Sequence, residues 1–123
     1  MLPYRDATLS VETRVTDLLA RMTLPEKCAQ LIWPFGLDDP DGQFPLEFAR
    51  QHFTNGISYV NSHHQRRSTA QTVAYLNALQ RFLRDETRLG IPALAFGEGL
   101  HGYMAHDATS FPQAIGLASA WDE

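Results

Sequence analysis

The chain has 123 residues, of which 44% are hydrophobic and 20% charged, so it can bury one modest core, as a single domain or a piece of a larger one. Its net charge is −4 and its ten lysines and arginines are scattered, which argues against nucleic acid as a partner. Its apolar runs are far shorter than the roughly 20 residues that span a membrane. The single cysteine, Cys28, excludes an internal disulfide and is expected to be a buried, inert thiol.

The amino terminus carries no recognisable targeting segment. Met1–Asp6 lacks the apolar core of a signal peptide, so the chain as written is expected in the cytoplasm. A mature chain whose signal had been removed would have the same sequence, and would then be secreted or periplasmic.

Two helix starts lie in the first part of the chain. Ser10 is placed to cap a helix whose apolar positions form one stripe over Val15–Met22, which we expect to face a core. Thr23 and Glu26 have the spacing of a capping box, which predicts a second helix through Leu31.

The second part of the chain alternates helix and strand patterns. Prolines and glycines predict a loop over residues 33–45, and Leu46–Phe53 is then expected to form a short helix. Ile57–Asn61 and Pro92–Phe96 have the short apolar runs of buried strands. Between them, the sequence predicts one helix from Ser68 to about Arg88, which Gly90 ends. Its core stripe is expected to consist of Val73, Leu76, Leu79 and Leu83.

This order of elements indicates an α/β fold. A strand, a long helix and a second strand imply two parallel strands joined by a right-handed crossover. Such a unit suits a (β/α) barrel or a doubly wound sheet, and periodicity alone does not choose between them. We expect residues 1–45 to be a helical opening segment with its loop, and residues 46–123 to be the first strand–helix–strand unit with the loop that follows.

Residues that could carry chemistry gather directly after the second predicted strand. Glycines surround Glu98 and His101 just beyond the carboxyl end of Pro92–Phe96. In barrels and open α/β sheets ligands bind at this edge, and a carboxylate there can accept hydrogen bonds from sugar hydroxyls. From spacing alone, Glu98 could equally be a solvated loop acid and His101 a packed histidine.

Several short motifs occur together in one order. They are Asp17-Leu18-Leu19, Met22-Thr23-Leu24, Glu26-Lys27, Asn77-Ala78-Leu79-Gln80, Gly90-Ile91-Pro92, Glu98-Gly99-Leu100-His101-Gly102, Ala108-Thr109-Ser110-Phe111-Pro112-Gln113 and Gly116-Leu117-Ala118-Ser119-Ala120-Trp121-Asp122. On these residues the chain resembles the amino-terminal segment of the catalytic barrel domain of family 3 glycoside hydrolases, in the branch of the β-glucosidases and β-xylosidases. The resemblance covers nearly the whole chain, and the Leu-His-Gly and Phe-Pro-Gln pieces together make it specific.

The resemblance implies a helix-rich, incomplete (β/α) barrel in which Ile57–Asn61 and Pro92–Phe96 are the first two strands. It gives Glu98 the role of an acid that lines the pocket for the terminal sugar, with His101 supporting the turn. It also implies that the nucleophile and the acid/base lie in later segments, so no catalytic residue is expected here and the isolated chain should be inactive. The expected partner is a carbohydrate substrate, and neither a metal nor an organic cofactor is implied.

Other functions remain open at this stage. Glu98 and Asp107 could form the acid/base pair of a complete small hydrolase, although nothing in the sequence positions them. His63-His64, or His101 with His106, could bind zinc, but neither pair has the i, i+4 spacing of the familiar helical motif. A non-catalytic sugar-binding or self-associating module is the rival from another class, since two barrel strands would leave open edges and uncovered helix faces.

Overall fold

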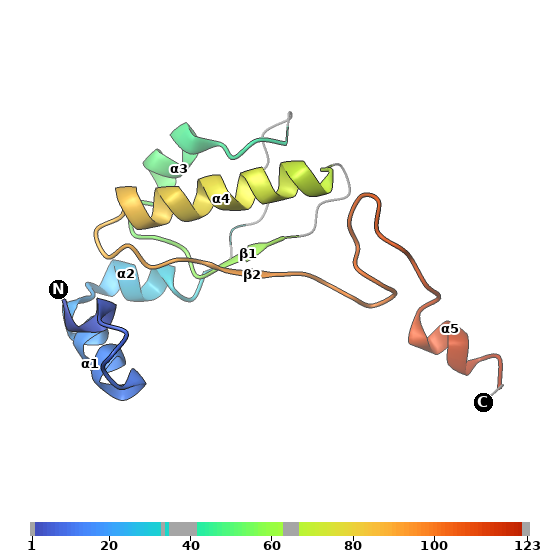
Figure 1. Cartoon of the computed structure of the whole chain (residues 1–123), viewed down its shortest axis with the longest axis horizontal. Helices are drawn as coiled ribbons and strands as arrows, with labels where there is room; N and C mark the ends of the chain where they lie inside the picture. Colours follow the sequence, from blue (N-terminus) through green and yellow to red (C-terminus); the bar gives the residue numbers. More distant parts are fainter. Residues whose placement is uncertain (1, 33, 35–41, 63–66, 122–123) are drawn as a thin grey trace.

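The computed structural model describes residues 2–32, 34, 42–62 and 67–121. Its elements follow the chain as η1 (Pro3–Arg5), α1 (Val11–Arg21), α2 (Leu24–Ala29), α3 (Leu46–His52), β1 (Tyr59–Asn61), α4 (Thr69–Glu86), β2 (Leu94–Phe96) and α5 (Ala114–Ala118). Figure 1 shows α4 lying along the two strands, with α1 and α2 at one end of this unit and residues 97–121 extending from its other end. The predicted order of short helices, strand, long helix and strand is confirmed.

The predicted helix starts at Ser10, Thr23 and Ser68 are confirmed, and at each of them a side chain satisfies a free backbone donor. The Ser10 hydroxyl accepts a backbone hydrogen bond in the first turn of α1. Thr23 and Glu26 form the predicted capping box of α2, in which the Glu26 carboxylate accepts from the Thr23 amide at 2.8 Å. Ser68 begins α4 with a second capping box, made with Gln71.

Strands β1 and β2 run parallel, with Tyr59 opposite Leu94, and α4 forms the crossover between them. Each strand is shorter than its predicted range, because ladder hydrogen bonds form only where both strands run side by side. The last of these bonds joins the Ser62 amide to the Phe96 carbonyl at 2.7 Å. The predicted fold class is confirmed: the chain forms a helix-rich α/β unit with two parallel strands, consistent with a partial barrel.

The core lies between α4, α3 and the sheet. Its buried members are Ala49, Ile57, Val60, Tyr75, Leu79, Phe82, Leu83 and Ala93. Phe44 packs against this cluster from the segment before α3, with its ring centroid 5.6 Å from that of Tyr75 and 5.9 Å from that of Phe82. Aromatic contacts therefore join α4 to the chain that precedes the first strand.

The predicted core stripe of α4 is partly wrong. Leu79 and Leu83 are fully buried, but Val73 is 53% exposed, and Tyr75 and Phe82 take part in the core instead. Both sets of residues have helical spacing. The large rings of Tyr75 and Phe82 bury more apolar area than a valine, so the helix is rotated to turn them inward.

The apolar stripe of α1 is not a core face in the described part of the chain, which corrects a second prediction. Val15 and Leu19 are 47% and 49% exposed, and only Met22 at the end of the stripe is buried. These side chains line a shallow groove of about 400 Å³, here called the α1 groove. It is formed by Val15, Leu18, Leu19, Met22, Lys27, Gln30, Leu31 and Ile91.

The first two α-helices are tied to the turn that follows α4. Glu26 is buried, and its carboxylate accepts hydrogen bonds from the Arg88 guanidinium at 2.8 and 2.5 Å. The same guanidinium donates to the Arg21 carbonyl at 2.9 Å. The Tyr4 hydroxyl donates to the Leu89 carbonyl at 2.7 Å. These contacts hold α1 and α2 against the segment that leads into β2.

A further pair of hydrogen bonds fixes the start of β2 against α4. The Gln80 side-chain amide donates to the Ala93 carbonyl at 2.7 Å, and its oxygen accepts from the Ala93 amide at 3.1 Å. Gly90, between α4 and this point, has a φ of +62°, and a Cβ there would lie 3.0 Å from the Arg84 carbonyl oxygen. A glycine is therefore needed where the chain leaves the helix.

Residues 111–121, here called the C-terminal arm, extend away from the core (Figure 1). They include the short helix α5, which the weak periodicity of this stretch did not predict. The arm exposes its large apolar side chains, Phe111 at 60%, Ile115 at 79%, Leu117 at 56% and Trp121 at 93%. None of the described helices, α5 included, has the length and apolar character needed to cross a membrane.

Cys28 is exposed, which corrects the prediction of a buried thiol. Helix α2 has only six residues and buries Glu26 and Ala29, which lie three positions apart on one face. Cys28 lies off that face, so its apolar neighbours in the sequence do not cover it.

Candidate functional site

The candidate site lies at the carboxyl ends of β1 and β2, where Ser62 and Gly97 follow the two strands. The Phe96 carbonyl accepts hydrogen bonds from the amide and from the hydroxyl of Ser62, each at 2.7 Å. These bonds hold the two strand ends together. Glu98 follows two residues after Phe96 and is exposed at this edge of the sheet.

The turn that carries Glu98 is closed by its own backbone. The Phe111 amide donates to the His101 carbonyl at 2.6 Å. Gly102 has a φ of +95°, and a side chain there would collide with the Thr109 carbonyl. The glycine therefore allows two backbone segments to approach closely, rather than only leaving room for a ligand.

The structure brings both predicted site residues into this one turn. Glu98 is exposed, whereas His101 is partly buried and holds the turn through its backbone carbonyl. A contact of either side chain with sugar stays a prediction. Ser62 and Tyr103, which lie 3.2 Å apart at their hydroxyl oxygens, contribute to the same edge and were not predicted. Only the position of Ser62, directly after a predicted strand, could have indicated it.

The other acid of this loop has a different neighbour. Asp107 has a φ of +64°, and its carboxylate lies 2.8 Å from Nδ1 of His106. Both side chains are more than half exposed, so this contact is a surface pair. Within the part of the chain that the structure describes, no group of three or more metal-ligating side chains is present, and His63-His64 lie outside that part.

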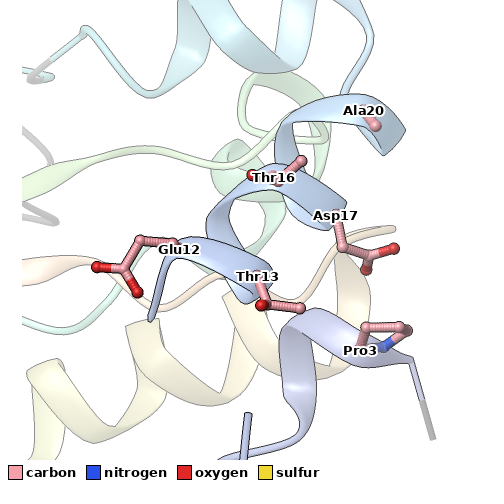
Figure 2. Close-up of a pocket in the computed structure, with 6 residues that line it drawn as sticks. All are labelled: Pro3, Glu12, Thr13, Thr16, Asp17 and Ala20. Atoms are coloured by element: carbon pink, nitrogen blue, oxygen red, sulfur yellow. The ribbon is translucent and has the colours of Figure 1, made fainter. Parts of the chain in front are cut away.

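A pocket at the opposite end of the molecule also contains carboxylates. It lies between η1 and α1 and is lined by Pro3, Glu12, Thr13, Thr16, Asp17 and Ala20 (Figure 2). Asp17 accepts hydrogen bonds from the Tyr4 amide at 3.1 Å and from Arg21 at 2.8 and 2.9 Å. The bond from Arg21 lowers the pKa of Asp17 below its usual range. Asp17 therefore holds η1 against α1, and Figure 1 shows α1 at the opposite end of the chain from the segment that follows β2.

Comparisons with known proteins identify relatives of the chain. No protein-family model matches it. It is 32% identical over 133 residues to "Probable beta-glucosidase C" of Aspergillus flavus and to the protein of the same name in Aspergillus oryzae, covering 97% of this chain and 21% of each relative. It is 29% identical over 133 residues to "Beta-glucosidase C" of Emericella nidulans, with the same coverage.

The chain thus spans about a fifth of the length of the curated relatives it matches, while nearly all of it is matched. This relationship confirms the resemblance predicted from the motifs, that of a segment of a family 3 glycoside hydrolase. The chain is therefore related to glycosidases.

Proposed function

We propose that this relative of the β-glucosidases forms one wall of the sugar pocket of a retaining glycoside hydrolase acting on terminal β-linked glucosides or similar sugars. Glu98 would accept hydrogen bonds from the hydroxyls of the terminal sugar. The observation that supports this role is the position of Glu98, exposed in a closed turn at the carboxyl edge of two parallel strands.

The chemistry of a carboxylate fits this task. Its two oxygens accept several hydrogen bonds, and bonds to an ionised acceptor are about twice as strong as neutral ones. Cleavage with retention needs two carboxyl groups about 5–5.5 Å apart, one as nucleophile and one as acid/base. We propose that both come from a later part of the enzyme, so that this chain binds sugar without cleaving it. The other acid of the loop, Asp107, pairs with His106.

Calorimetric titration of the chain with glucose or cellobiose tests this role. Glu98→Gln keeps the shape of the side chain but removes its charge, and should weaken binding by about tenfold or more. Asp107→Asn is the matched control, because it removes the same charge from the same loop, and asparagine tolerates the positive φ found there. The control should bind as the wild type does.

Two results would contradict the proposal. Equal sugar binding by Glu98→Gln and the wild type would show that Glu98 does not contact the sugar. Turnover of an aryl β-glucoside by the isolated chain, lost in Glu98→Gln, would show that the chain is a complete small hydrolase.

A second function, self-association, is favoured by the exposed apolar surfaces. The C-terminal arm carries four large exposed apolar side chains, and the α1 groove is lined mostly by apolar ones. Figure 1 shows the arm and helix α1, which lines the groove, at opposite ends of the chain, so we propose that the arm of one copy docks in the groove of another. Contacts of this head-to-tail kind form a ring if the rotation between copies closes, and an open string of copies if it does not.

Analytical ultracentrifugation over a range of concentrations measures this association. Ile115→Glu in the arm and Leu19→Glu in the groove should each weaken it by about tenfold or more, because a charge would be buried. Gln113→Glu and Ala20→Glu are the controls, since they place the same charge at exposed neighbouring positions. A wild-type chain that stays monomeric at every concentration would exclude this function.

A further inference from the structure

A chain of hydroxyl groups joins the loop after β2 to the end of β1. The Ser62 hydroxyl donates to the Phe96 carbonyl at 2.7 Å, and its oxygen lies 3.2 Å from the Tyr103 hydroxyl oxygen. A serine hydroxyl has one proton, which here is used on Phe96. The Tyr103 hydroxyl must therefore donate to Ser62, which gives the order Tyr103 to Ser62 to Phe96.

The ring of Tyr103 is placed by a close contact with the backbone. A Cβ on Gly97 would lie 2.6 Å from Cε2 of the Tyr103 ring, and 3.3 Å from the Ser62 hydroxyl oxygen. Only glycine leaves space for the ring and the hydroxyl at this point, so Gly97 and Tyr103 fit together as a pair. Glu98 is the next residue along the chain.

The backbone of Glu98 itself is held by the residue that follows Tyr103. The Met104 amide, adjacent to Tyr103, approaches the Glu98 carbonyl at 3.4 Å. Two contacts thus hold the turn: Gly97 packs against the Tyr103 ring just before Glu98, and the Met104 amide contacts the carbonyl of Glu98 itself. Both contacts involve Tyr103 or its neighbour Met104, and the Tyr103 hydroxyl contacts Ser62.

We propose that Ser62 and Tyr103 are positioning residues, which together form a latch that holds Glu98 over the carboxyl edge of the sheet. The latch consists of contacts within the fold, whereas its effect on sugar binding rests on the proposed function of Glu98. An ordered carboxylate binds sugar hydroxyls more tightly than a mobile one, because less conformational freedom is lost on binding.

Amide hydrogen exchange of residues 97–104, followed by NMR, tests the latch without any ligand. Tyr103→Phe removes only the hydroxyl, and should speed exchange in this turn by about three- to tenfold, the range expected for loss of one hydrogen bond. Tyr59→Phe is the matched control, because Tyr59 is 43% exposed and Tyr103 is 44% exposed. Ser62→Ala should act like Tyr103→Phe, whereas Ser62→Thr keeps the hydroxyl and should restore slow exchange.

Titration with glucose or cellobiose then separates the latch from the sugar pocket. If the wild type binds, Tyr103→Phe and Ser62→Ala should weaken binding by about three- to tenfold, with an unchanged urea midpoint. Faster exchange with unaltered sugar binding would overturn the positioning role. Unaltered exchange in both variants would overturn the latch itself. If the wild type binds no sugar but the turn loosens in the variants, the latch stands and the proposed function fails.

Discussion

Replacing Arg88 with methionine should clearly lower the free energy of unfolding, because the buried Glu26 carboxylate then loses the guanidinium that pairs with it. The Glu26 carboxylate is buried, and the hydrogen bonds from the Arg88 guanidinium are the main reason that the pKa of Glu26 falls from 4.5 to about 2. Without Arg88, the hydrogen bonds that remain to this buried carboxylate from the described residues are those from Thr23. Urea unfolding at neutral pH measures the loss.

The pairing of Glu26 with Arg88 also predicts how the free energy of unfolding depends on pH. Because the pKa of Glu26 is lower in the folded chain than in the unfolded one, its ionised form favours folding. This contribution is fully present above about pH 4.5 and is lost as the pH falls toward 2. The free energy of unfolding should therefore decrease between pH 5 and pH 3 more steeply in the wild type than in Arg88→Met.

Arg84→Met provides the control for both measurements. Arg84 pairs with Asp85 at 2.6 Å near the end of α4, but the two side chains are 67% and 51% exposed. Exposed pairs contribute about 1 kcal/mol or less, so this variant should unfold nearly as the wild type does. Equal losses in Arg84→Met and Arg88→Met would show that Glu26 is not held as described.

Truncating Leu79 to alanine should cost about 2–5 kcal/mol of the free energy of unfolding. Leu79 is fully buried in the core cluster, so the change leaves a cavity between α4 and the sheet. Val73 lies on the same helix and was expected in the same stripe, but it is 53% exposed. Val73→Ala should change the free energy of unfolding by about 0.5 kcal/mol or less.

Urea unfolding of the two variants side by side checks this prediction. A large loss in Val73→Ala would mean that α4 turns the predicted stripe, rather than Tyr75 and Phe82, toward the core. Comparable small losses in both variants would mean that the core is not packed in solution.

Local patterns predicted most of the fold. The caps at Ser10, Thr23 and Ser68 could be found because each acts on a backbone group within a few residues of itself. The stripes of α1 and α4 were predicted less well, because periodicity shows that a helix has an apolar face but not which element covers it. Tyr75, which is buried where Val73 is not, packs against Phe44, a residue far away in the sequence.

The candidate site, too, could be predicted only where its pattern is local in the sequence. The turn that carries Glu98 and His101 could be predicted, because glycines and a preceding strand mark it in the sequence itself, whereas a role of either side chain in sugar binding stays a prediction. Ser62 and Tyr103 could not be paired in advance, since 41 positions separate them and only the parallel arrangement of β1 and β2 brings them together. The tie between Glu26 and Arg88 spans 62 positions and has no local signature either.

The contacts of Tyr4 and Glu26 also set an order of events during synthesis. Their partners, Leu89 and Arg88, leave the ribosome long after α1 and α2 have been made. Until then those helices lack these partners, although their caps allow them to form locally. The helices α1 and α2 are therefore made before the turn after α4, but they reach their final place only once that turn has been made.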